Sequence, residues 1–274
     1  MSTSSDLLMV KLGGSLITDK RGEAKARVDV IERLAGELAA ARAAMTEDVL
    51  LGHGSGSFGH LAAARHGLGR GLRHAGGEAP PIAASATQDA AARLHRIVVD
   101  ALVRAGVPAF SVAPSSAFLA DGGRLVRGFI EPLEAALGEG LVPVVYGDVV
   151  ADRSLGVSIC STENALEYLV RRLRRRGRRV RRVLWLGETA GVYDRQGRTV
   201  PRVDAASYRD VRRLIGAPAG TDVTGGMLLR LATARSLARL GVESWIFDGR
   251  RSGALESALL GREVAATRVV AQAS

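Results

Sequence analysis

The residues best suited to chemistry form the glycine-rich segment Gly52-His-Gly-Ser-Gly-Ser-Phe-Gly-His60, which directly follows an apolar run at residues 49–51. Glycines at the end of a strand let the backbone approach a ligand closely, and successive backbone N–H groups ahead of a helix bind phosphate oxygens. A second such segment, Gly13-Gly-Ser15, follows an apolar run at residues 7–12 and lies between Lys11 and Lys20. Two phosphate-binding loops with cations nearby predict phosphoryl transfer.

The segment at residues 52–60 also satisfies the dinucleotide-binding pattern G-x-G-x-x-G, through Gly54, Gly56 and Gly59. That pattern should be followed about 20 residues later by an acidic residue that ends a second strand. The nearest acid, Glu78, lies in Gly-Gly-Glu-Ala-Pro-Pro, which predicts a loop. The Walker pattern G-x-x-x-x-G-K-S/T does not occur in the sequence. The sequence therefore argues against a dehydrogenase and against an ordinary P-loop kinase.

Length and composition indicate a globular protein. The chain has 274 residues, of which 47% are hydrophobic, and this is enough for one large α/β domain or two small ones. No apolar run approaches the roughly 18–20 residues of a membrane span, and the first residues lack a signal-type pattern, so we expect a cytoplasmic protein that does not bind membranes. The single cysteine, Cys160, excludes an intramolecular disulfide and is expected to be a small buried residue.

The net charge of +10 arises because 38 basic residues oppose 28 acidic ones, and much of the excess lies in the run from Arg171 to Arg182. Only 4% of all residues are aromatic, and none interrupts this run to stack on bases. We therefore expect no nucleic-acid partner and interpret the run as a solvated helix end and turn, with its arginines near the negative end of the helix dipole. The remaining excess would raise the local concentration of anionic substrates.

Apolar strands alternate with amphipathic helices along the chain, which predicts an α/β fold with a largely parallel sheet covered on both faces. The predicted strands are residues 7–12, 49–51, 109–112, 142–146, 183–186, 244–247 and 266–270. The predicted helices are residues 28–45, a helix that starts near residue 58, and residues 85–105, 131–137, 162–175 and 225–240. No Pro/Ser-rich linker divides the series, so both halves of the chain should share one sheet.

Five segments form a series: Lys11-Leu-Gly-Gly-Ser15, Gly54-Ser-Gly-Ser-Phe-Gly-His60, Val142-Pro-Val-Val-Tyr-Gly-Asp-Val-Val150, Gly191-Val-Tyr-Asp194 and Asp222-Val-Thr-Gly-Gly-Met227. In this order they resemble the amino-acid kinase superfamily, and within it the isopentenyl phosphate kinases. The resemblance implies a single domain over residues 1–274, a three-layer α/β/α sandwich with a mainly parallel central sheet of about eight strands. Residues 1–178 would bind the acceptor and residues 179–274 the nucleotide.

The resemblance also implies an activity: transfer of the γ-phosphoryl group of ATP to isopentenyl phosphate, by a homodimer, with Mg²⁺ carried by ATP rather than held by protein ligands. The catalytic residues would be Lys11, Lys20 and His60. The ATP-binding residues would be Lys11, Gly13, Gly14, Ser15, Ser55, Glu188, Gly226 and Arg230. The acceptor-binding residues would be Gly54, Gly59, His60 and Thr162, with Glu163 as a candidate organising acid. A phosphate acceptor is already anionic at neutral pH, so His60 would act as a hydrogen-bond donor or a cation rather than as a base.

Several residues depart from the family pattern. Glu163 and Arg230 stand where the family commonly has Asp and Lys, and Glu188 and Ala190 stand in a segment that usually reads Thr-Asp-Val-Asp-Gly. Two alternatives therefore stay open: a kinase of another small phosphate or phosphonate, similar to fosfomycin kinase or aminomethylfuran phosphate kinase, and a non-catalytic nucleotide-binding protein. The remaining histidines have no paired carboxylate spacing, so no metal site is expected at any of them. These are His53, His66, His74 and His95.

Overall fold

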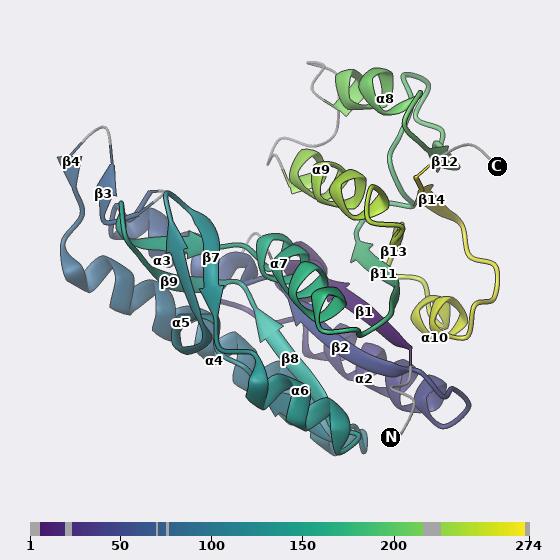
Figure 1. Cartoon of the computed structure of the whole chain (residues 1–274), viewed down its shortest axis with the longest axis horizontal. Coiled ribbons are helices and arrows are strands. Elements are labelled where there is room, and N and C mark those ends of the chain that lie inside the picture. Colours follow the sequence, from purple (N-terminus) through teal and green to yellow (C-terminus); the bar gives the residue numbers. More distant parts are fainter. Residues whose placement is uncertain (1–5, 20–23, 70, 75–76, 216–225, 272–274) are drawn as a thin grey trace.

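The structure, a computed structural model, describes residues 6–19, 24–69, 71–74, 77–215 and 226–271. Its centre is an eight-stranded sheet with the strand order β12-β14-β13-β11-β1-β2-β8-β5 (Figure 1). In that order the strands are Arg202–Val203, Ala266–Val269, Glu243–Asp248, Val180–Gly187, Leu7–Leu12, Asp48–His53, Val142–Tyr146 and Ala109–Ser111. All neighbouring strands in this sheet run parallel except β13 and β14. The predicted α/β fold with a mainly parallel sheet is confirmed.

Helices cover both faces of this sheet, because side chains alternate between the faces along each buried strand. Leu7 and Met9 of β1 belong to one hydrophobic cluster, and Leu8 and Val10 belong to another. The helices that close the first cluster are α6 (Glu131–Gly138), α7 (Thr162–Arg175) and α9 (Gly226–Ala238). Those that close the second are α2 (Val28–Arg42), α4 (Pro81–Arg104) and α10 (Ala254–Leu259). The result is the expected three-layer arrangement.

A second sheet, which the sequence patterns did not predict, continues from β8 and has the strand order β10-β9-β6-β7. Its strands in that order are Gly156–Cys160, Asp148–Asp152, Phe118–Asp121 and Arg124–Gly128. Val150 joins the first large cluster, whereas Val149 packs with residues of α4 such as Ala83 and Ala84, so β9 is covered on both faces. Cys160 of β10 is buried, as expected.

Several short elements complete the chain. They are α1 (Gly14–Ile17), α3 (Gly56–Arg65), α5 (Pro114–Ala117), α8 (Tyr208–Ile215) and the hairpin of β3 (Arg73–His74) with β4 (Gly77–Glu78). Figure 1 shows the second sheet and the hairpin on the opposite side of the molecule from α8 and β12.

The predicted helix boundaries differ from the observed ones by a few residues. α4 begins at Pro81 instead of residue 85, because proline fits the first turn of a helix, where its missing N–H costs no hydrogen bond. α2 ends at Arg42 rather than residue 45, and α3 begins at Gly56 rather than near residue 58. Among the described residues, no helix combines the length and the apolar composition needed to cross a membrane.

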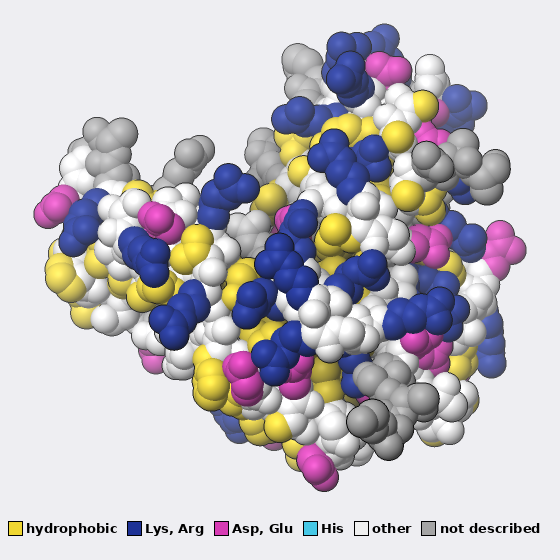
Figure 2. All heavy atoms as spheres, in the orientation of Figure 1, with side chains coloured by type: hydrophobic (Ala, Val, Ile, Leu, Met, Phe, Trp, Pro, Cys, Tyr) yellow, Lys and Arg dark blue, Asp and Glu magenta, His cyan; other side chains and the backbone are white. Residues whose placement is uncertain are grey.

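The arginine run from 171 to 182 covers the end of α7, the turn after it and the start of β11. Its side chains contribute to the basic surface seen in Figure 2. Arg175 is exposed, as expected for a solvated helix end. Arg178 instead forms an ion pair with Asp48 of β2, and the Arg182 guanidinium lies 3.8 Å from the ring centre of Trp245. The prediction of a solvated run is therefore wrong for these two residues: Arg178 holds the turn against the sheet, and Arg182 packs on a neighbouring strand within it.

Candidate active site

Three loops meet at the carboxyl edge of the central sheet. Near the end of β1, Lys11 is the register partner of Gly52 in β2 and of Trp185 in β11. Because these strands are parallel, the loops that follow them, at Gly13, Gly54 and Glu188, emerge at the same edge. Open α/β sheets bind their ligands at this edge.

The two predicted glycine loops are in direct contact. A Cβ atom added to Gly14 would lie 2.6 Å from the backbone N of Gly56, and one added to Gly54 would lie 2.8 Å from the N of Gly14. The Thr18 hydroxyl joins the loops, since it donates to the Gly14 carbonyl (2.8 Å) and accepts from the Ser57 N–H (3.0 Å). Glycine permits this approach, and the two loops form one continuous backbone surface.

Two buried cations and one carboxylate lie beside this surface. Nζ of Lys11 is 2.8 Å from Oε1 of Glu163, the second residue of α7, and both side chains are buried. Burial lowers the pKa of Lys11, an effect that Glu163 opposes and Arg230 reinforces. Burial alone would raise the pKa of Glu163, but the charges of Lys11 and Arg230 hold it below its ordinary value. Lys11 and Arg230 therefore place basic side chains beside the loops, which suits an anionic ligand.

Arg230 is the fifth residue of α9, so it lies on the second turn of this helix, and its side chain is buried. Its Nη1 lies 2.8 Å from the place that a Cβ of Gly187 would take, and its Nη2 lies 3.7 Å from the corresponding place at Gly13. The absence of side chains at these two glycines leaves room for the guanidinium between the end of β11 and the first glycine loop.

His60 is the fifth residue of α3, and its side chain is partly exposed to solvent. The surrounding protein nevertheless lowers the pKa of His60, first by desolvation and then through the charge of Lys11, while Glu163 acts in the opposite direction. The ring is therefore mainly neutral at pH 7. In that state it can still donate one N–H to an anion.

The remaining residues predicted on the first two loops lie at the same edge. Gly13 donates its N–H to the Leu186 carbonyl (2.8 Å), so this amide is already used within the protein. Ser15 lies in α1, and Ser55 is the N-cap residue of α3. Gly59 lies close to Ser55, since a Cβ there would be 2.5 Å from the Ser55 Oγ.

The residues predicted on other elements have protein partners of their own. Thr162 is buried at the start of α7, and its hydroxyl donates to the His53 carbonyl (2.6 Å). Glu188 forms a 2.8 Å ion pair with Arg27, the N-cap residue of α2. Gly226 is the first residue of α9, and Lys20 lies outside the described residues.

A buried group of three aromatic rings, which the sequence patterns did not predict, lies directly behind the second glycine loop. Nε2 of His53 is 3.0 Å from Nδ1 of His95, and the ring of Tyr146 stacks on both. His53 and Tyr146 are register partners at the ends of β2 and β8, so correct pairing of these two strands would have placed them together. His95 lies next to Leu94 on the buried side of α4.

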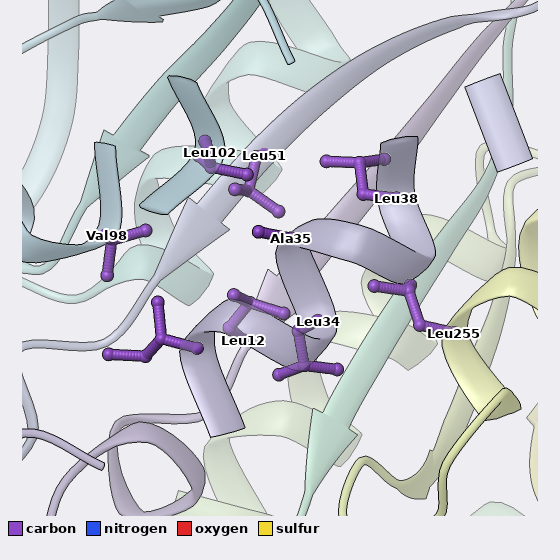
Figure 3. Close-up of a pocket in the computed structure, with 9 residues that line it drawn as sticks. Leu12, Leu34, Ala35, Leu38, Leu51, Val98, Leu102 and Leu255 are labelled. Carbon is purple, nitrogen blue, oxygen red and sulfur yellow. The ribbon is translucent and has the colours of Figure 1, made fainter. Parts of the chain in front are cut away.

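An apolar pocket lies away from this site, between the sheet and helices α2, α4 and α10 (Figure 3). Its lining consists of Leu12, Ile31, Leu34, Ala35, Leu38, Leu51, Val98, Leu102 and Leu255. All nine side chains belong to the second hydrophobic cluster, and none can pair with a phosphate. We interpret the pocket as a packing gap in the core.

Comparisons with known proteins agree with this geometry. The isopentenyl phosphate kinase of Methanothermobacter thermautotrophicus is 35% identical over 270 residues, which cover 96% of this chain and 98% of that protein. The isopentenyl phosphate kinase of Haloferax volcanii is 34% identical over 241 residues, or 88% of this chain and 91% of that protein. A solved structure of an isopentenyl phosphate kinase superposes with a TM-score of 0.79 at 32% identity and covers 96% of this chain and 99% of that one. The family model described as the amino acid kinase family matches residues 6–248, and the chain belongs to this family.

Proposed function

We propose that this ATP-dependent kinase phosphorylates isopentenyl phosphate to isopentenyl diphosphate. The observation that carries the proposal is the joined pair of glycine loops with Lys11 and Arg230 buried beside them. Two isopentenyl phosphate kinases share 35% and 34% sequence identity with this chain over most of their length, which supports the choice of acceptor.

The proposed chemistry requires two phosphate groups to approach each other, although both are anionic. In phosphoryl transfer a protein contributes mainly positioning and neutralisation of charge. Lys11 and Arg230 supply positive charge at the carboxyl edge, and Glu163 fixes the ammonium of Lys11 at 2.8 Å. The amides of Gly14 and Ser55 would bind phosphate oxygens of ATP, and Lys20 would add charge, as expected from the sequence. Ser15 would contact the same phosphates, whereas the N–H of Gly13, expected to bind them as well, is already bonded to the Leu186 carbonyl.

The acceptor phosphate would lie against Gly54 and Gly59, with His60 as hydrogen-bond donor. The lowered pKa of His60 supports a neutral donor rather than a cation. A phosphate oxygen is itself the nucleophile, so no base is required at this position. The buried hydroxyl of Thr162 already donates to the His53 carbonyl. Thr162 would therefore bind the acceptor through its backbone N–H.

The division of the chain at residue 178 into an acceptor half and a nucleotide half is part of the proposal. The C-terminal half would supply Glu188, Gly226 and Arg230 to the nucleotide. The turn between α7 and β11 lies at this boundary, and β11 pairs directly with β1 of the other half. The two halves therefore share one sheet, and ATP would lie across their junction.

We further propose that Mg²⁺ enters with ATP and is coordinated mainly by phosphate oxygens and water, which is its usual mode in kinases. Within the described part of the chain, no three His, Cys, Asp or Glu side chains converge as a metal site. Two acids at the carboxyl edge, Glu163 and Glu188, form ion pairs with Lys11 and Arg27. A cytoplasmic homodimer completes the proposal. Light scattering of the purified protein would test its assembly.

The deciding experiment is release of ADP from MgATP in the presence of isopentenyl phosphate, dimethylallyl phosphate and a panel of other small phosphates and phosphonates. We expect isopentenyl phosphate to give the highest kcat/KM. A higher value with another phosphate would reassign the acceptor, and no rate above the ATPase background with any acceptor would favour a non-catalytic protein.

A further inference from the structure

The aromatic group behind the second glycine loop forms a connected series of hydrogen bonds. Oγ of Ser111, at the end of β5, lies 2.9 Å from Nε2 of His95. Nδ1 of His95 lies 3.0 Å from Nε2 of His53, and Nδ1 of His53 lies 3.1 Å from the carbonyl oxygen of Gly54. His53 and His95 are both buried, and the ring of Tyr146 covers them.

The chemistry of the last acceptor sets the direction of every hydrogen bond in the series. A carbonyl oxygen can only accept, so Nδ1 of His53 must carry a proton. Burial lowers the pKa of His53 to about 4 and that of His95 to about 3, so both rings are neutral at pH 7. In a neutral imidazole only one nitrogen is protonated. Nε2 of His53 therefore accepts from Nδ1–H of His95, and Nε2 of His95 accepts from the Ser111 hydroxyl.

We propose that this one-directional chain from Ser111 through His95 and His53 fixes the peptide between Gly54 and Ser55, and that the two histidines are positioning residues for the phosphate loop. The proposal rests on the proposed function for its catalytic consequence. It concerns residues that do not touch the substrate, since both rings lie behind the loop.

The consequence for the loop follows from the geometry of the peptide bond. A trans peptide is planar, and its C=O and N–H point in opposite directions. The described residues contain no cis peptide. When His53 holds the Gly54 carbonyl on the side of the buried rings, the N–H of Ser55 must point to the other side. Ser55 is one of the residues expected to bind the phosphates of ATP.

Other contacts fix the start of the same loop. The carbonyl of His53 accepts from the Thr162 hydroxyl (2.6 Å) and from the N–H of Gly147 (2.9 Å). A Cβ at Gly147 would lie 3.1 Å from the Ser55 N, so the segment after β8 packs directly against the loop. Both the backbone and the side chain of His53 therefore determine where the loop leaves β2.

Burial is the main reason why the two rings stay neutral, and nearby charges add to it. The charge of Lys11 lowers the pKa of His53 further, and those of His53 and Arg96 lower the pKa of His95. Burial beside Asp148 raises the pKa of Tyr146, whose phenol stays neutral as well. The hydrogen-bond directions should therefore stay constant over the pH range in which the kinase works.

The direct test is the tautomeric state of the rings, read from nitrogen NMR of protein labelled with ¹⁵N-histidine. The chain has only five histidines, and spectra of His53→Asn and His95→Asn assign the two signals. We expect both rings to carry the proton on Nδ1 and none on Nε2 from about pH 5.5 to about pH 8. A proton on Nε2 of either ring, or titration of either ring near the ordinary histidine pKa, would overturn the chain. This result does not depend on which acceptor the kinase uses.

The second test compares two uncharged replacements, using whichever phosphate acceptor turns over fastest. The amide nitrogen of Asn in His53→Asn can take the place of Nδ1 and donate to Gly54, whereas that of Gln in His53→Gln reaches only the place of Nε2. We expect a fall in kcat/KM of about 10²-fold for His53→Gln, because a displaced loop misaligns the phosphates. The fall should be clearly smaller for His53→Asn, which keeps the donor to Gly54 and loses only the bond to His95. His66→Asn, at the end of α3, is the control and should retain wild-type kcat/KM. Equal activities of the two His53 variants would disprove the proposed role of the Nδ1 proton.

Discussion

The ammonium of Lys11 and the carboxylate of Glu163 form a 2.8 Å ion pair in which both side chains are more than nine-tenths buried. β1 supplies the lysine and the first turn of α7 supplies the acid, so the pair also joins the sheet to a helix that covers it. A negative side chain near a helix N-terminus is favourable in itself. The positive charge of Arg230 also acts on Glu163 and, together with Lys11, favours its ionised form.

The first prediction is that Glu163→Gln destabilises the protein by about 3–5 kcal/mol, because it leaves the buried ammonium of Lys11 without the carboxylate it pairs with. Urea unfolding without ATP measures this. Glu167→Gln is the matched control, one turn further along α7, where the acid is partly exposed and pairs with Arg171. It should cost only about 0.3–0.5 kcal/mol. Equal losses for the two variants would contradict the role of Glu163.

The stability that Glu163 contributes should also depend on pH. Its pKa in the folded protein lies below the ordinary value of 4.5. The contribution is therefore complete above this ordinary value and is lost as the pH falls through the lower, folded-state value. Unfolding at a series of pH values should show the wild type approaching Glu163→Gln only in acid. A gap that stays constant as the pH falls would argue that Glu163 is not ionised in the native state.

The second prediction concerns the contact between the glycine loops. Gly14→Ala would place a methyl group 2.6 Å from the backbone N of Gly56, so the loops must separate. We expect kcat to fall by about 10²-fold and stability to fall by about 1–3 kcal/mol. Gly36→Ala is the control, since this exposed glycine in α2 has nothing within 4 Å of an added Cβ. It should raise stability by about 0.5–1 kcal/mol and leave activity unchanged. Unchanged kinetics in Gly14→Ala would show that the loops tolerate separation.

The third prediction is that Arg230→Ala raises the KM for ATP or lowers kcat by about 10–100-fold, the usual effect of losing hydrogen bonds to a charged group. Arg175→Ala, at an exposed position, should change neither constant at physiological salt. Arg178→Ala should lower stability instead, because it breaks the pair with Asp48. Steady-state kinetics and urea unfolding of all three variants separate these effects. Equal kinetic effects for Arg230→Ala and Arg175→Ala would exclude a specific phosphate contact by Arg230.

The central sheet could be predicted because its strands are buried and carry a continuous apolar pattern, as in Leu7–Leu12. The second sheet could not, because strands such as Phe118–Asp121 have four residues and only two fully buried side chains. Such a short alternation is indistinguishable from a loop in the sequence. The glycine loops were predictable for a different reason, since their residue types are required by the close approach of two backbones.

Pairings between distant residues account for contacts that the sequence could not show, at the site and elsewhere. Arg178 looks like its exposed neighbours in the arginine run, but its partner Asp48 lies 130 positions away. His53 and His95 are likewise 42 positions apart and meet only because α4 packs across the end of β2. No spacing rule within one element predicts contacts of this kind.

The last prediction concerns His60. His60→Ala should lower kcat by about 10²-fold or more, by analogy with the loss of one preorganised donor, while ATP binding persists. His60→Gln keeps an N–H donor without a titratable ring and should be intermediate. His66→Ala, at the other end of α3, should leave kcat unchanged. An unchanged kcat in His60→Ala would show that His60 makes no hydrogen bond that matters to the reaction.

The pH dependence distinguishes a neutral His60 from a cationic one. The pKa of His60 lies below 6.5 in the free protein, first because of desolvation and then because of Lys11. A neutral donor keeps its N–H at every pH above that pKa, so the ratio of kcat/KM between wild type and His60→Gln should stay constant from about pH 6.5 to about pH 8.5. The acceptor phosphate titrates equally in both proteins and cancels in the ratio. If His60 acted as a cation, the advantage of the wild type would instead decrease steadily as the pH rises.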